Sequence, residues 1–196
     1  MADPARTDAD PVPRSHAAAD STARWYAGLP TMFGAAAALF TNRVGQVLLV
    51  KPNYRNHWSL PGGILEHGEP PHVGCRREVA EETGIDITPA LLLVIDWAPP
   101  EGDRPKPVVH FVFDGGVLDD GVRIRLQADE LDDYRFVDPG DLDSYLPSFM
   151  SARVSAGLRG RADGATVYLS RPLAAGVRAG RPTRARRQAD GLERVA

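Results

Sequence analysis

The sequence predicts an α/β protein, in which helices pack on a mixed β-sheet to form an α/β sandwich. Strand-like apolar segments outnumber helical ones, and they do not alternate one by one with helices as in a regular parallel sheet. A chain of 196 residues is long enough for one domain with a full core, but short for two. We therefore expect a single domain over residues 23–172.

The first elements are a hairpin and a helix. Residues 35–51 contain two apolar strands joined by a turn at residues 42–45. Proline and glycine interrupt residues 57–71, which predicts a loop or a loop with short strands. The pair Pro70-Pro71 is typical of a helix start and Gly84 of a helix end, so a helix is expected between them.

The elements after this helix are read from apolar runs and their spacing. Residues 98–107 are rich in proline and predict a loop between two buried strands. The remaining expected strands are residues 90–97, 107–116, 122–126, 134–137 and 166–170, and the remaining expected helices are residues 140–146 and 148–158.

Both ends of the chain differ from this domain in composition. Residues 1–22 are rich in Asp, Ala and Pro without periodicity, which predicts a disordered arm. Residues 173–196 are rich in arginine and have no apolar face, which is typical of a solvated, disordered tail. The other interpretation of this tail is a contact with phosphate or with an acidic surface.

Composition excludes several classes of protein. The formal net charge is −3, so the molecule as a whole has no strong bias toward nucleic acid or membrane. Cys75 is the single cysteine, which rules out an internal disulfide and a thiolate zinc cluster within one chain. Residues 1–16 lack the apolar core of a secretory signal, and no apolar run approaches the ~20 residues that span a bilayer. We expect a soluble, cytoplasmic protein.

An unusual group of acidic residues lies in the predicted helix. Glu78, Glu81 and Glu82 occupy positions i, i+3 and i+4, which share one helix face. Like charges at this spacing cost roughly 0.2–0.5 kcal/mol per pair. An oxygen-rich patch of this kind suits a hard divalent cation such as Mg²⁺ or Mn²⁺ rather than zinc.

The surrounding residues complete a spaced pattern. Gly63 is followed by five residues and Glu69, and then by seven residues and the segment REVAEETGI, residues 77–85. This resembles the signature of the Nudix hydrolases, G-x5-E-x7-R-E-U-x-E-E-x-G-U with U aliphatic, without departure at any position. Seven fixed letters at ~6% each match by chance on the order of 10⁻⁹ times per starting point. The resemblance implies a Nudix-like α/β/α sandwich and hydrolysis of a pyrophosphate bond.

The resemblance also implies roles for individual residues. Glu78 and Glu82 are expected to be the principal metal ligands, together with the backbone carbonyl of Gly63. Glu81 is expected to be a further ligand, or to orient or deprotonate the attacking water. Arg77 is expected to hold Glu78 and Glu69 in position.

The general base varies in this family and can lie outside the signature. Residues 128–133 offer Asp129, Glu130 and Asp133, of which we select Glu130. Trp58 and Trp97 are candidates for stacking on a nucleobase, although buried packing is the commoner role of tryptophan. Cys75 is interpreted as a packing residue. Four histidines show no metal-ligand spacing and are interpreted as surface or core residues: His57, His67, His72 and His110.

The sequence is compatible with several classes of substrate. Pro100 lies fifteen residues beyond Ile85, a position where proline accompanies ADP-ribose pyrophosphatases in this family. The candidates are nucleoside diphosphate-linked compounds, including ADP-ribose and nucleotide sugars, and nucleoside triphosphates. The alternative is a catalytically silent Nudix-like module that senses a nucleotide, although such a module would be expected to lose carboxylates that are present here. Family members often form homodimers, and the tail leaves RNA 5′ ends open as a substrate.

Overall fold

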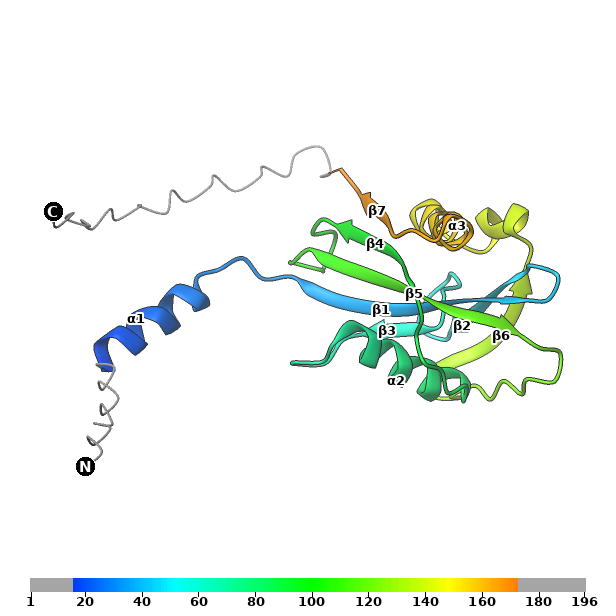
Figure 1. Ribbon diagram of the computed structural model, residues 1–196, viewed down its shortest axis with the longest axis horizontal. Helices are drawn as coiled ribbons and strands as arrows, with labels where there is room; N and C mark the ends of the chain where they lie inside the picture. The colour runs from blue at the N-terminus through cyan, green and yellow to red at the C-terminus, as the bar shows by residue number, and fades with distance from the viewer. Residues whose placement is uncertain (1–15, 173–196) are drawn as a thin grey trace, which may run out of the picture.

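The computed structural model describes residues 16–172 and shows one seven-stranded sheet with helices on both faces (Figure 1). The elements are α1 (His16–Ala27), β1 (Phe33–Asn42), β2 (Val47–Pro52), β3 (Gly62–Ile64), α2 (Pro71–Thr83), β4 (Leu92–Ala98), β5 (Val108–Leu118), β6 (Leu131–Val137), the 3₁₀ helix η1 (Pro139–Ser144), α3 (Ser148–Asp163) and β7 (Val167–Ser170). The strand order is β6-β2-β1-β5-β4-β7, with β3 paired to β1.

The sheet is mixed, as the sequence predicts. β1 is parallel to β5 and antiparallel to β2 and β3, and β4 is antiparallel to β5 and parallel to β7. The hairpin between β1 and β2 turns where expected, because the Asn42 side-chain oxygen accepts hydrogen bonds from the amides of Val44 and Gln46. Gly45 supplies the positive φ of this turn, at 87°.

Each face of the sheet has its own core. Leu39 packs in the cluster with Val154 of α3, whereas its neighbours Ala38 and Phe40 pack in the cluster with Val79 of α2. This alternation follows from the two-residue period of a strand. Figure 1 shows α2 on one face of the sheet and α3 on the other, so the predicted sandwich is confirmed.

The helix that carries the acidic residues has the expected bounds. Pro71 occupies its first turn, and Gly84 ends it in the left-handed conformation with φ of 69°. The amide of Gly84 donates a hydrogen bond to the carbonyl of Ala80. The position of Glu78, Glu81 and Glu82 is therefore fixed by local sequence at both ends of α2.

Two expectations about local structure were wrong. Residues 16–22 are helical rather than part of a disordered arm, because their alanine-rich sequence favours a helix. Residues 122–126 do not form a strand; the amide of Arg125 bonds to the carbonyl of Thr83, so this segment runs past the end of α2. The segment 140–146, expected to be helical, contains most of the 3₁₀ helix Pro139–Ser144.

The expectations for residues 1–15 and 173–196 lie outside the described residues. Within residues 16–172, none of the helices combines the length and the apolar character that crossing a bilayer requires.

Candidate active site

The acidic face of α2 is tied to the loop that precedes it. The backbone amide of Gly62 donates a hydrogen bond of 2.7 Å to Glu82 Oε2. Gly62 pairs with Ala37 of β1 and has φ of 142°, and a Cβ at this position would clash with the backbone of Ala36. A side chain is therefore excluded where β3 begins to pair with β1, and this close approach brings the backbone of Gly62 to Glu82.

Arg77 organises the other carboxylates. Its Nε and Nη2 each donate a hydrogen bond of 2.9 Å to Glu69, one to each carboxylate oxygen. Its Nη1 donates to Glu78 Oε1 at 2.9 Å and to Glu81 Oε2 at 3.1 Å. The contacts expected between Arg77 and both Glu78 and Glu69 are thus present, and a planar guanidinium is the group that makes such paired contacts.

The three helix carboxylates differ in exposure. Glu82 is 6% exposed and the Glu78 side chain 15%, whereas the Glu81 side chain is 52% exposed. Glu78 and Glu82 therefore face the protein interior, and Glu81 lies at its edge.

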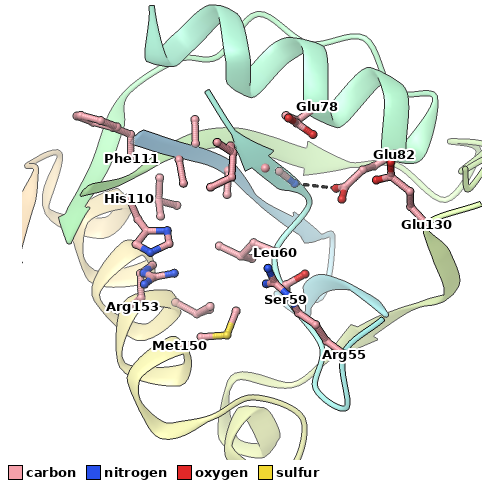
Figure 2. Close-up of a pocket in the computed structure, with 18 of the residues that line it drawn as sticks. Arg55, Ser59, Leu60, Glu78, Glu82, His110, Phe111, Glu130, Met150 and Arg153 are labelled. Atoms are coloured by element: carbon pink, nitrogen blue, oxygen red, sulfur yellow. Dashed lines mark hydrogen bonds between the residues drawn. The ribbon is translucent and has the colours of Figure 1, made fainter. Parts of the chain in front are cut away.

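Glu130 lies close enough to interact with these groups. Its backbone carbonyl accepts a hydrogen bond from the amide of Asn53, and the amide of Gln127, on the same turn, bonds to the carbonyl of Glu82. The turn is thereby anchored to the end of α2. Figure 2 shows the carboxylates of Glu82 and Glu130 side by side.

Burial and the repulsion between neighbouring carboxylates raise the pKa of Glu78 and Glu82. Burial, with smaller contributions from Glu78 and Glu130, raises the pKa of Glu82 to about 8, even though the amide of Gly62 opposes the shift. Burial also raises the pKa of Glu78 above its ordinary value. In contrast, hydrogen bonds from Arg77 lower the pKa of Glu69 to about 2. Glu69 is a stable ion-pair partner, whereas the protein's own groups disfavour the charged forms of Glu78 and Glu82, which a bound cation would favour.

The donor set fits a hard divalent cation. Glu78, Glu82 and Glu130 present carboxylate oxygens, and a Cβ on Gly63 would lie 2.5 Å from the carboxylate of Glu78, so only glycine leaves room between this backbone and Glu78. Over residues 16–172, no three Asp, Glu, His or Cys side chains converge tightly enough to form a complete metal site by themselves. Substrate oxygens and water commonly supply the remaining ligands of Mg²⁺.

These carboxylates open into a cavity of about 390 Å³, within the range of small-molecule sites. The loop and strand residues that line it are Ala35, Ala36, Ala37, Tyr54, Arg55, Ser59, Leu60, Gly62, Gly63, Ile64, His110, Phe111 and Val112. The helix and turn residues are Arg77, Glu78, Glu81, Glu82, Glu130, Leu146, Met150, Arg153 and Val154. Six of the eight predicted site residues line this cavity, namely Gly63, Arg77, Glu78, Glu81, Glu82 and Glu130.

The two predicted stacking residues lie elsewhere. Trp58 packs edge-on against Tyr145 at 5.7 Å between ring centroids, with the guanidinium of Arg135 over its ring. Trp97 lies on β4, and neither tryptophan lines the cavity. Cys75 is fully buried, and burial raises the pKa of its thiol to about 12, which fits a packing residue.

Most of the cavity lining was not predicted from the sequence, including three residues with basic side chains. Arg55, His110 and Arg153 all line the cavity. Arg55 lies on an irregular loop, His110 on β5 and Arg153 on α3, so no sequence spacing connects them. The polar position of His110 within an apolar strand was the only available signal.

Comparisons with known proteins agree with this geometry. The NUDIX domain family matches residues 32–155, more than half of the chain. An ADP-ribose pyrophosphatase from Mycobacterium tuberculosis is 38% identical over 78 residues, covering 37% of this chain and 38% of that protein. The 8-oxo-dGDP phosphatase NUDT18 from Homo sapiens is 35% identical over 88 residues, covering 41% of this chain and 25% of that protein. The chain thus spans well under half the length of these curated relatives.

A solved structure extends the likeness over most of the domain. The MutT protein from Methanosarcina mazei Go1 superposes with a TM-score of 0.58 and 27% identity, covering 67% of this chain and 96% of that one. Family match, fold and the acidic helix lead to the same conclusion: this chain belongs to the NUDIX domain family.

Proposed function

We propose that the protein hydrolyses a phosphoanhydride bond in a nucleoside diphosphate-linked compound, such as ADP-ribose or a nucleotide sugar, or in a nucleoside triphosphate. The observation that carries this proposal is the gathering of the Glu78, Glu82 and Glu130 side chains at one end of the cavity. The printed names of the relatives, an ADP-ribose pyrophosphatase and an 8-oxo-dGDP phosphatase, support the same class of substrate.

Glu78, Glu82 and the carbonyl of Gly63 would hold Mg²⁺ or Mn²⁺, with Glu81 as a further ligand. When bound, such an ion supplies neutralisation of phosphate charge and polarisation of water. The hydrogen bond from Gly62 fixes the carboxylate of Glu82, and Arg77 fixes that of Glu78. The protein therefore holds the two main ligands in place before any substrate arrives.

The remaining steps are assigned to residues around this centre. A water oxygen attacks one phosphorus, the bridging P–O bond breaks, and Glu130 accepts the proton of the water. Glu81 is the second candidate for orienting or deprotonating this water. Arg55 lines the cavity, and its charge acts on Glu82, so its guanidinium is placed to bind the phosphates.

The test is a screen of nucleotides with the purified protein. We expect release of a nucleoside monophosphate or inorganic phosphate with Mg²⁺ or Mn²⁺, and none after chelation with EDTA. Nucleotide binding without turnover across the whole panel, with either ion, would contradict the proposal and favour the silent sensing module.

Assembly and location form a further part of the proposal. The family resemblance supports a homodimer that takes a small nucleotide rather than nucleic acid, and the single cysteine is consistent with a reducing cytoplasm. Light scattering of the purified chain tests the dimer, and a monomer at micromolar concentration would contradict it.

A further inference from the structure

The turn that carries Glu130 is held between two other segments of the chain. The amide of Gln127 donates a hydrogen bond of 3.2 Å to the carbonyl of Glu82, and the amide of Glu130 closes the turn on the carbonyl of Gln127 at 3.0 Å. On its other side, the turn leads into β6, which pairs with the end of β2 through Leu131 and Pro52. The turn therefore lies between the end of α2 and the end of β2.

Asn53, the first residue after β2, contacts this turn twice. Its backbone amide donates a hydrogen bond of 2.9 Å to the carbonyl of Glu130, and its side-chain Nδ2 donates one of 2.7 Å to the carbonyl of Asp129. Pro52 has no amide hydrogen, so the last residue of β2 offers no backbone donor. Asn53 thus supplies two donors where the strand ends, and they bind two consecutive carbonyls of the turn.

The carboxylate of Glu130 has no anchor of its own. The residue is exposed, and over residues 16–172 neither a hydrogen bond nor an ion pair holds its side chain. Its charge and those of Glu78 and Glu82 repel one another, since Glu130 contributes to the raised pKa values of both. Figure 2 nevertheless shows its carboxylate beside that of Glu82. The backbone of the turn therefore has to keep this side chain in place.

The side-chain bond of Asn53 can affect geometry more than stability. A single hydrogen bond at an exposed site contributes little to the stability of a whole domain, so its loss should leave the fold intact. A reacting group is more sensitive to its position, because a displacement of about 1 Å can lower a rate by about 10²-fold. Asn53 lies outside the lining of the cavity, so a kinetic effect of its side chain has to pass through another residue.

We propose that Asn53 is a positioning residue, whose carboxamide holds the turn so that the carboxylate of Glu130 stays beside Glu82 and within reach of the attacking water. This inference rests on the proposed function, because it takes Glu130 to accept the proton of that water.

The first test is the effect of single substitutions on kcat and KM. Asn53→Ala removes the Nδ2 donor and keeps the backbone amide, so we expect kcat to fall about tenfold and KM to change by less than about twofold. Asn53→Asp has nearly the same shape but cannot donate, and should lose at least as much. Asn56→Ala, an exposed asparagine of the same loop that lies outside the cavity lining, is the matched control and should keep both constants.

A double-mutant cycle tests whether Asn53 acts through Glu130. Glu130→Gln should lower kcat by about 10²-fold or more. When Asn53→Ala is added to Glu130→Gln, kcat should fall by no more than about twofold further, because the group that Asn53 positions is already lost. A further tenfold fall in the double variant would show that the two residues act independently, and would overturn the inference.

Hydrogen exchange measures the position of the turn without turnover. In the metal-free protein in EDTA, Asn53→Ala should exchange about threefold faster or more in peptides that contain residues 127–131, because the turn opens locally. Peptides from α3 should be unchanged, and Asn56→Ala should match the wild type throughout. Unchanged exchange in residues 127–131 of Asn53→Ala would overturn the inference.

The outcomes separate this inference from the proposed function. Normal kcat in Asn53→Ala, together with a large loss in Glu130→Gln, overturns the role of Asn53 and leaves the proposed function standing. Normal kcat in Glu130→Gln contradicts Glu130 as the base, and with it the catalytic role of Asn53. If no anhydride is hydrolysed, the proposed function fails, and the exchange data alone support or overturn the anchoring of the turn by Asn53.

Discussion

Oε2 of Glu82 accepts a hydrogen bond of 2.7 Å from the backbone amide of Gly62, twenty residues earlier in the chain. This bond joins α2 to the start of β3, which pairs with β1. It fixes the carboxylate of Glu82, a residue that is only 6% exposed. A buried acid held by a single amide is poised to receive a cation, because one hydrogen bond does not replace the lost hydration of its charge.

Replacement of Glu82 by glutamine tests its role directly. A glutamine side-chain oxygen can still accept the hydrogen bond from Gly62, so the fold should be retained, while the loss of one negative ligand should lower kcat by about 10²-fold or more. Steady-state kinetics and circular dichroism measure the two effects. Glu66→Gln, an exposed acid outside the cavity, is the control and should keep its activity. Normal turnover in Glu82→Gln would remove this residue from the metal site.

The stability of the metal-free protein should depend on pH through Glu82. Its folded pKa of about 8 is raised above the ordinary value of 4.5, so the folded state binds more protons than the unfolded state between these values. The contribution of Glu82 to stability is therefore present below about pH 4.5 and is lost as pH rises toward 8. In EDTA, Glu82→Gln should be more stable than the wild type at pH 8, and this advantage should shrink at pH 5.

Scanning calorimetry of both proteins at the two pH values checks this prediction. Addition of Mg²⁺ at pH 8 should raise the melting temperature of the wild type more than that of Glu82→Gln, because ligand binding to the folded state stabilises it. A stability difference that is the same at pH 5 and pH 8 would show that Glu82 does not titrate in this range.

Arg77 offers a matched comparison with its neighbour. Arg77→Lys loses the paired contact with Glu69 and the contact with Glu78, so kcat should fall by about 10- to 100-fold, as for other residues that orient metal ligands. Arg76→Lys changes only an exposed ion pair with Asp86, which solvent screens, and should leave activity nearly unchanged. Equal kinetics for the two variants would contradict a positioning role for Arg77.

Gly62→Ala should destabilise the domain and the site together. The left-handed φ of 142° and the close backbone of Ala36 leave no room for a Cβ, so we expect a loss of roughly 1–3 kcal/mol in the free energy of unfolding, together with reduced turnover. Gly121→Ala, where a Cβ would meet no neighbouring atom, is the control. Urea denaturation measures both, and equal midpoints would show that the loop can shift to admit a side chain.

The acidic half of the site could be predicted from sequence because its residues lie close together in the chain. The spacing from Gly63 to Gly84 fixes a loop, a helix start and a helix face, all of which depend on local geometry. The opposite wall could not be predicted. Arg153 meets Asp96 across 57 residues of chain, and their partnership follows from the packing of α3 on β4 rather than from any local pattern.

The errors in secondary structure have a similar cause. Residues 122–126 alternate like a strand, but Ile124 packs against the α2 side of the sheet while the backbone of Arg125 pairs with Thr83 at the end of α2. One-sided packing of an irregular segment gives the same two-residue period as a strand. Only the tertiary position of this segment distinguishes the two.

The cavity is lined by α2 on one side and by α3 on the other, and this arrangement affects how substrate specificity can change in evolution. Mutations in α3 can change the wall around Arg153 without contact with α2, which packs on the other face of the sheet (Figure 1). After gene duplication, substitutions in α3 could therefore alter which substrate is bound while the carboxylates of α2 stay unchanged.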